Sequence, residues 1–461
     1  MAGSGESPPI LSGWDAGRAY ARLVLDPIHN AFRLHGELGP VFAIDPPFTN
    51  GKKGRRGVLV ARQDLAEHVL DHPEAFLTVG LSLVRGPKGS AQRRLRDGLI
   101  RMNGPQQAVF RRSYAPGLTK TRVGAHAQEM SEVAAAEIAA WPTHSAFDGL
   151  TALKHIVRRA AASLLFNAGS DDDALRLAGL VERHSALQYS LFPLVAPIAF
   201  PGLPYDRLLR HAERTEQALM DWIGKNHQAQ DGDDMVSRIC ALRDEGGSPL
   251  CPSAQAAQLW TLYGASFETT STALSWAVMH LAWNPEAARR LLRELSRDGE
   301  QTPFLDAVVD ETLRMSPPVV YQVRRTAADC ELGGVPLNQG DRIFLSAAVM
   351  NRDPAIYSEP NTFAPERWLT METNAFRPLA FSAGPRRCLG VNFARAVIKS
   401  TLAALWPALL VKVKPAAEIG VRIAITQEPR ILPLIVSHQN GKFVGASFTG
   451  AAARQMSHAV H

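Results

Sequence analysis

The sequence is poor in cysteine and has no pair of cysteines that would define a metal site or a disulfide framework. Among 461 residues there are four, Cys240, Cys251, Cys330 and Cys388. No two of them stand in the C-x-x-C spacing of zinc ligands. This excludes a zinc module and a small disulfide-stabilised secreted domain, and it indicates a reducing cytoplasm.

Long apolar runs, linkers and a large excess of one charge are also missing. No apolar stretch is long enough to cross a bilayer, and residues 1–10 lack the regions of a signal peptide, so we expect no membrane anchor. No Gly/Ser linker occurs, which predicts one domain over 1–439 and a small, polar, flexible tail over 440–461. Lys and Arg exceed Asp and Glu by six. That balance favours an acidic protein partner over nucleic acid, with ordinary surface charge as the alternative.

Helical periodicity dominates the residues that are present. It predicts a helical core over 64–318 and 391–409, with a long helix from about Ser253 to Trp283 that ends before Asn284-Pro285. Strand patterns are confined mainly to 41–62, 319–370 and 410–438. The expected fold class is mainly α with a minor β portion.

The most informative stretch is Phe381-Ser-Ala-Gly-Pro-Arg-Arg-Cys-Leu-Gly390, which precedes a predicted helix. Thiolate is the form of cysteine that binds metal, and nearby cations and a helix N-terminus favour it. The glycines let the backbone approach a large flat ligand. A lone cysteine is more often a buried structural residue, but the spacing around Cys388 favours a metal ligand.

Three further motifs accompany this loop. Glu311-Thr-Leu-Arg314 places opposite charges on one helix face, which alone is typical of a surface pair. With Arg367 of Phe363-Ala-Pro-Glu-Arg-Trp368, the pair can instead form a buried network that holds the loop before Cys388. Ala265-Ser-Phe-Glu-Thr-Thr270 puts an acid and hydroxyls into an apolar helix, either as satisfied or kinking hydrogen bonds or as a proton relay.

In this order the four motifs resemble the cytochrome P-450 family of haem-thiolate monooxygenases, over nearly the whole chain. The resemblance implies the family's triangular, α-rich fold with small β-sheets, and haem b (iron protoporphyrin IX) with O₂ as co-substrate. It implies that Cys388 is the iron ligand, that Phe381 packs against the haem, that Gly384 permits the turn and that Gly390 lets the following helix approach.

The resemblance also implies roles for residues outside the loop. Thr269 matches the oxygen-activating alcohol and Glu268 its acidic neighbour, which together deliver protons during oxygen activation. Glu311, Arg314 and Arg367 match a structural triad. The positions that contact haem or neutralise its propionates are Arg111, Arg324, Arg386, Gln107 and Ala265.

Two positions depart from the family pattern. Ser266 stands where glycine is usual, and it either narrows the oxygen groove or adds a hydroxyl to the relay. Gln107 stands where many members have a propionate-binding histidine. It is a weaker, neutral donor.

The function implied is a monomeric, cytoplasmic, bacterial-type monooxygenase that hydroxylates or epoxidises a lipophilic molecule such as a terpenoid, steroid, fatty acid or natural-product intermediate. Electrons are expected from NAD(P)H through a ferredoxin or flavodoxin and its reductase. The docking surface is expected to contain Arg112, Arg387, Arg395 and Lys399. The alternatives are a peroxide-driven or rearranging haem-thiolate enzyme, and a non-catalytic haem sensor. Expected pocket segments are 78–90, 192–203, Tyr263–Phe267, Pro318–Val323 and Ile425–Pro429.

Overall fold

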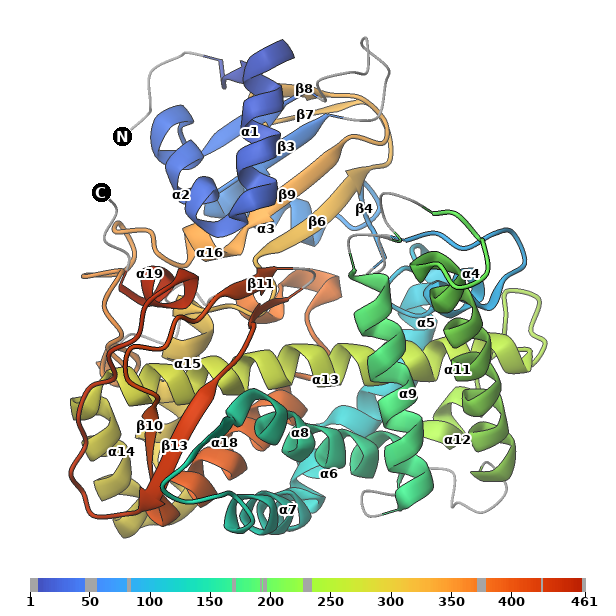
Figure 1. Ribbon diagram of the computed structural model, residues 1–461. Coiled ribbons are helices and arrows are strands. Elements are labelled where there is room, and N and C mark those ends of the chain that lie inside the picture. The colour runs from blue at the N-terminus through green and yellow to red at the C-terminus, as the bar shows by residue number, and fades with distance from the viewer. Residues whose placement is uncertain are drawn as a thin grey trace. The chain divides into compact units, whose positions relative to one another are not determined.

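The computed structural model describes residues 7–45, 56–80, 84–167, 171–190, 193, 197–226, 234–370, 379–423 and 426–457 (Figure 1). The chain forms two compact units, each assembled from stretches that are distant in the sequence. The sheet unit contains residues 1–79, 310–388 and 450–461. The helical unit contains residues 80–309 and 389–449.

A six-stranded sheet organises the sheet unit. Its strand order is β1-β2-β3-β9-β6-β4, in which β1 and β2, and β3 and β9, are parallel and the other pairs antiparallel. The strands are β1 (Ile10–Leu11), β2 (Val41–Ile44), β3 (Gly57–Val60), β4 (Phe76–Thr78), β6 (Tyr321–Thr326) and β9 (Arg342–Ser346).

Strand alternation gives this sheet two buried faces. Val58 and Val60 of β3 pack in a core with Leu70 of α3 (Gln63–Asp71), whereas Leu59 packs with residues of α1 (Gly13–Leu25) and α2 (Pro27–Leu38). Successive side chains point to opposite faces of a strand, so a fully apolar strand indicates cover on both sides. Helices lie over the sheet in Figure 1 accordingly.

Shorter elements complete the sheet unit. They are β7 (Cys330–Leu332), β8 (Val335–Leu337), α16 (Ala347–Met350), α17 (Arg367–Thr370), η4 (Leu379–Phe381), η5 (Gly384–Arg386) and α19 (Ala451–Ser457). Helix α15 (Pro303–Met315) begins in the helical unit and ends in the sheet unit.

Helix α13 (Pro252–Trp283) is the centre of the helical unit and the long horizontal helix of Figure 1. Pro252 occupies its first turn, and Asn284 ends it before Pro285. It is buried on nearly all sides because α8 (Gly149–Phe166), α9 (Asp172–Gln188), α11 (Pro204–Asn226) and α18 (Val391–Ala408) pack around it. The predicted long helix is confirmed.

Among the described residues, the other helices of this unit are α4 (Ala91–Arg94), η1 (Leu95–Asp97), α5 (Pro105–Tyr114), η2 (Ala115–Leu118), α6 (Lys120–Ala125), α7 (Ala127–Ala139), α12 (Met235–Cys240), α14 (Pro285–Asp298) and η3 (Gly299–Gln301). One antiparallel sheet has the order β10-β13-β5, from β10 (Leu409–Val413), β13 (Pro433–His438) and β5 (Ala146–Asp148). A hairpin pairs β11 (Val421–Ile423) with β12 (Gln427–Pro429).

The mainly α class with small sheets is confirmed, but two details differ from the prediction. Strands β4 and β5 fall inside the span predicted to be helical, because each is three residues long and exists through pairing with a strand distant in sequence. The segment predicted as a flexible tail contains α19, whose Ala452 and Met456 are buried. The buried Arg352 donates a hydrogen bond of 2.9 Å to the carbonyl of Gln455 and fastens this helix.

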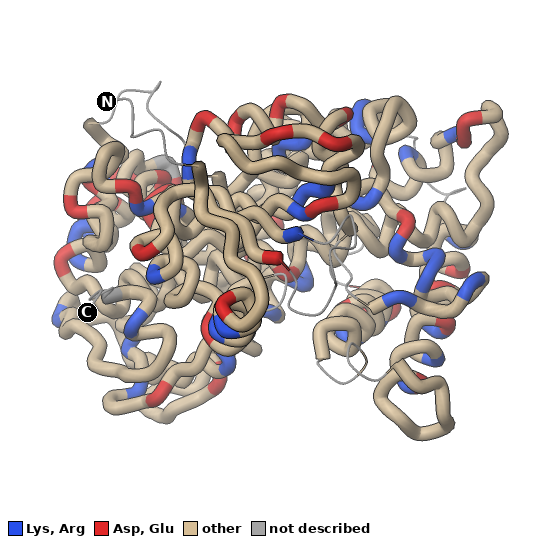
Figure 2. The backbone as a smooth tube through the Cα atoms, turned by 90° about the horizontal axis from the view of Figure 1, so that it is seen from above, with Lys and Arg blue, Asp and Glu red and all other residues tan. Residues whose placement is uncertain are grey.

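Charged residues are interspersed along the chain, with Lys/Arg and Asp/Glu segments alternating in Figure 2. None of the helices in the described ranges combines the length and the hydropathy needed to cross a bilayer.

Candidate active site

The loop that carries Cys388 folds back on itself within the sheet unit. The amide of Cys388 donates to the carbonyl of Phe381 at 2.7 Å, and the amide of Arg387 donates to that of Gly384 at 3.1 Å. Cys388 is exposed. These backbone groups therefore form hydrogen bonds within the loop itself, and the cysteine side chain is accessible to a ligand.

Gly384 is required by the geometry of this loop. Its φ is +60°, and a Cβ added there would lie 2.7 Å from the carbonyl oxygen of Leu70 at the end of α3. A side chain is therefore excluded both by the left-handed backbone and by contact with rigid main chain.

The predicted network around Glu311 is present and buried. Glu311 and Arg314 have side chains that are 0% exposed, and they are joined by hydrogen bonds of 2.9 and 2.8 Å. Glu311 also accepts from Arg367 Nε at 3.1 Å, Trp368 Nε1 at 2.9 Å and the amide of Ala364 at 2.8 Å. Five hydrogen bonds offset the desolvation of this carboxylate, as a buried ion pair requires.

Arg314 extends that network to the chain that precedes the cysteine loop. Its guanidinium donates to the carbonyls of Asn351, Pro360 and Thr362 at 2.7–3.1 Å. The network thereby fastens α15 to the 351–368 stretch.

Arg324 and Arg386 form a cationic pair in the same unit. Arg324 lies on β6 and is buried, with one hydrogen bond of 3.1 Å to the carbonyl of Val323. Burial, together with the charge of Arg386, lowers the pKa of Arg324 to about 10. A bound dicarboxylate would relieve both effects, so this pair fits a doubly anionic ligand.

In the helical unit, Gln107 and Arg111 lie one turn apart on α5, and Gln107 is buried. They share a helix face, as the four-residue spacing predicts.

The hydroxyls of α13 bond to their own helix. Thr269 Oγ1 donates to the carbonyl of Ala265 at 2.7 Å, and Ser266 Oγ donates to the carbonyl of Leu262. Farther along, Ser271 bonds to the carbonyl of Phe267 in the same way at 2.7 Å. Because each hydrogen is committed to a carbonyl, these oxygens retain capacity only to accept.

Glu268 lies in a charged environment on the same helix. Burial raises its pKa to about 7; Lys154 and Arg422 lower it, while Glu428 and Glu182 raise it. The Ala265–Thr270 motif therefore contains a carboxyl group, that of Glu268, which exchanges its proton near neutral pH.

Comparison with known proteins identifies the family. The cytochrome P-450 family model matches residues 22–420. The chain belongs to the cytochrome P-450 family. Pentalenene oxygenase of Streptomyces avermitilis is 30% identical over 347 residues, which is 70% of this chain and 76% of that protein. Cyclooctatin synthase of Streptomyces melanosporofaciens is 28% identical, over 81% of this chain and 85% of that protein.

Other relatives align over less of their length. A putative cytochrome P-450 137 of Mycobacterium tuberculosis is 30% identical over 261 residues, and the chain spans about half of it, 54%. Among solved structures, retinoic acid bound cyanobacterial CYP120A1 matches with a TM-score of 0.77 at 20% identity, covering 95% of this chain and 100% of that one. This likeness places the chain in the cytochrome P-450 fold.

As a cytochrome P-450, the chain is expected to carry haem, and the sheet unit offers suitable groups. Cys388 is exposed in a loop of cations and turns, and Arg324 and Arg386 suit two propionates. Within this unit the structure brings together Cys388, Phe381, Gly384, Arg386 and Arg324. The other expected site residues, Gln107, Arg111, Ala265, Glu268, Thr269 and Gly390, belong to the helical unit.

The charged partners of Glu268 were not predicted from the sequence. Lys154 lies on α8, Glu182 on α9, and Arg422 and Glu428 on the β11–β12 hairpin. No short motif links them, and each is typical of a surface residue when considered alone. The expected pocket segments 78–90 and 192–203 lie partly outside the described residues. Ile425, the first residue of the expected segment Ile425–Pro429, also lies outside them.

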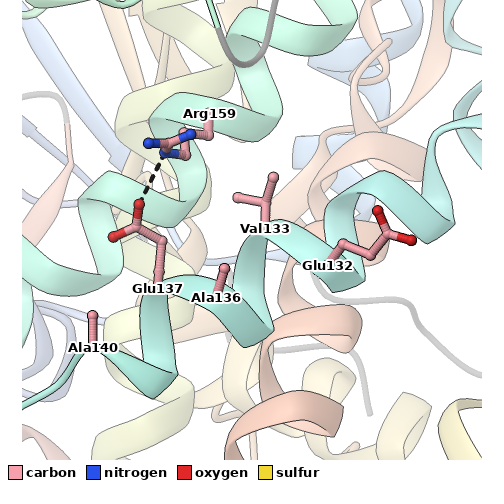
Figure 3. Close-up of a pocket in the computed structure, with 6 residues that line it drawn as sticks. All are labelled: Glu132, Val133, Ala136, Glu137, Ala140 and Arg159. Carbon is pink, nitrogen blue, oxygen red and sulfur yellow. Dashed lines mark ion pairs between the residues drawn. The ribbon is translucent and has the colours of Figure 1, made fainter.

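A shallow hollow elsewhere on the helical unit is unrelated to these residues. It lies between α7 and α8, where Arg159 and Glu137 form an ion pair of 2.9 Å (Figure 3). None of the six side chains that line it is an expected site residue.

Two of the four cations predicted to form a docking surface, Arg395 and Lys399, pair with a carboxylate of the same unit. Asp306 of α15 binds Arg395 at 3.0 Å and Lys399 at 2.9 Å, so both cations already have an internal carboxylate partner. Although burial opposes it, these two cations hold the pKa of Asp306 below its usual value. The positive charge available there for a redox partner is smaller than the sequence indicates.

Proposed function

We propose that this chain is a haem-thiolate monooxygenase that inserts one oxygen atom from O₂ into a lipophilic small molecule, using electrons from NAD(P)H. The observation that carries the proposal is the exposed Cys388 in its self-bonded loop, in the same unit as the Arg324–Arg386 pair. When bound, haem b supplies the iron at which O₂ is reduced and its oxygen transferred.

The protein residues have separate tasks in this proposal. Cys388 supplies a thiolate ligand, which the neighbouring Arg386 and Arg387 favour over the thiol. Arg324 and Arg386 hold the propionates. The Glu311–Arg314–Arg367 network keeps the preceding stretch in place and takes no part in chemistry.

Glu268 is the proton donor in this proposal, and Thr269 is the neighbouring hydroxyl that accepts hydrogen bonds. The carboxyl of Glu268 has a pKa of about 7, so it both gains and loses a proton near neutral pH. Thr269 Oγ1 gives its own hydrogen to the carbonyl of Ala265, which leaves its lone pairs to accept hydrogen bonds. Ser266 is bound in the same way, so we assign it no proton-donating role.

A terpenoid is the substrate class we favour. The names of pentalenene oxygenase and cyclooctatin synthase, to which the chain is 30% and 28% identical, support this choice. A ferredoxin or flavodoxin with its reductase would deliver the electrons.

The test is turnover with purified redox partners. Cyclic terpene hydrocarbons and their alcohols are screened for a substrate-induced change in the haem spectrum, and those that bind are incubated with NAD(P)H under ¹⁸O₂. We expect substrate-stimulated NAD(P)H oxidation and one ¹⁸O atom in the product. Oxygenation that requires added peroxide, or binding without electron uptake, would contradict the proposal.

A further inference from the structure

Glu428 on β12 is a buried acid of the helical unit with two cationic partners. Its side chain is 3% exposed and lies between two cations from different elements. Lys154 Nζ of α8 is 2.5 Å from its Oε1, and Arg422 of β11 donates to its Oε2 at 2.6 Å. The hairpin is fastened to α13, because Trp276 Nε1 donates to the carbonyl of Gln427 at 2.8 Å.

The second acid in this region, Glu182, has its own partners. Arg158 binds it through two hydrogen bonds of 2.9 and 2.6 Å, and Tyr263 donates to it at 2.7 Å. Arg158 is therefore committed to Glu182. The cations that act electrostatically on Glu268 are Lys154 and Arg422, and both are engaged by Glu428.

We propose that Glu428 is a positioning residue that competes with Glu268 for Lys154 and Arg422, and so keeps Glu268 able to exchange a proton. This inference rests on the proposed function, in which Glu268 supplies protons. A carboxylate that faces two cations without a competing anion stays ionised well below neutral pH and cannot act as an acid there. Glu428 counters this effect because it places one negative charge between the two cations.

The electrostatics around Glu268 agree with this geometry. The groups that face it are Lys154 from α8, Glu182 and Tyr189 from α9 and its C-terminal end, Tyr263 on α13 itself, and Arg422 and Glu428 from the hairpin. Burial is the largest influence and raises the pKa of Glu268; the cations lower it, and Glu428 counters them. The balance leaves the pKa near 7.

The β11–β12 hairpin therefore influences the protonation of Glu268 without contacting the reacting atoms. Lys154 and Arg422 are partly exposed, with side chains 21% and 45% accessible, so they could turn toward Glu268 if Glu428 lost its charge. Replacing Glu428 by the isosteric Gln keeps the shape and removes the competing anion.

The test follows the protonation of Glu268 directly. In the haem-loaded protein, without substrate or electron donor, the infrared band of a protonated carboxyl is recorded against pH and assigned to Glu268 by its loss in Glu268→Gln. We expect Glu428→Gln to lower the midpoint of this band by at least about one pH unit. Lys154→Met should raise it, because it removes a cation and leaves Glu428 charged.

A matched control removes a carboxylate that also pairs with α8. Glu137→Gln breaks the pair with Arg159 and should leave the Glu268 midpoint in place. An unchanged or raised midpoint in Glu428→Gln would overturn the inference, as would a lowered midpoint in Lys154→Met. Either result would leave the proposed monooxygenase activity standing, because substrate oxidation under ¹⁸O₂ is measured separately on the unmodified protein.

Discussion

At Ser266 a hydroxyl stands where the family resemblance leads one to expect glycine. The sequence left two interpretations open, a narrowed groove or an added relay group. The structure shows Ser266 Oγ donating to the carbonyl of Leu262, just as Thr269 does to Ala265. The hydroxyl hydrogen of Ser266 is therefore already engaged in a hydrogen bond to the backbone of its own helix.

Glu268 should make stability depend on pH. Its pKa is raised from 4.5 to about 7, so the fold favours the protonated form. The contribution to stability is complete below pH 4.5 and is lost as pH rises through 7. Relative to Glu268→Gln, the native protein should lose on the order of 3 kcal/mol at most between pH 5 and 8.

Denaturant unfolding of both proteins across that range measures the difference. Parallel stability curves for the native protein and Glu268→Gln would contradict the assigned environment of Glu268.

Gly384 offers a second test at the residue scale. Gly384→Ala should destabilise the protein by about 1–3 kcal/mol and reduce haem loading, because the new Cβ meets the Leu70 carbonyl and the backbone is left-handed. Gly299→Ala is the matched control, since its φ of +64° is similar and its added Cβ would meet nothing within 4 Å. Equal effects in thermal unfolding and haem content would mean that backbone conformation alone matters.

At the scale of elements, the Glu311 network joins helix α15 to the stretch that precedes the cysteine loop. Glu311→Gln leaves the fully buried Arg314 without a carboxylate partner, so we expect a loss of about 3–5 kcal/mol of unfolding free energy. Asp15→Asn, which breaks an exposed pair with Arg18 in the same unit, should cost less than about 1 kcal/mol. Similar losses in both variants would show that the network is not stabilising.

The elements that the sequence predicted correctly are those with local signals. Helix α13 was predicted from its helical periodicity and from Asn284-Pro285 at its end, and the Glu311 network from two short motifs that precede one cysteine. The contacts of Glu428 with Lys154 and Arg422 were not predicted, because these residues lie on three elements, β12, α8 and β11, and meet only after folding. Helix α19 was not predicted because a segment of small residues is typical of a flexible terminus. Its burial depends on contacts with Arg352 and with the core, which are distant in sequence.

At the scale of the whole molecule, redox-partner binding depends on how surface charge is distributed. Asp306→Asn frees Arg395 and Lys399 from their internal partner. We expect several-fold tighter, more salt-dependent binding of an acidic ferredoxin, measured by titration at two ionic strengths. Asp298→Asn changes the net charge equally but only affects the exposed Arg297. If both variants bind alike, the surface around Asp306 is not the docking site.

We propose that Cys388 binds haem iron as a thiolate. The most direct measurement is the absorption spectrum of the reduced protein with carbon monoxide, for the native chain and for Cys388→His. We predict the red-shifted Soret band of thiolate-ligated haem in the native protein and its absence in Cys388→His. A native spectrum typical of histidine-ligated haem, or a red-shifted band that persists in Cys388→His, would contradict the account.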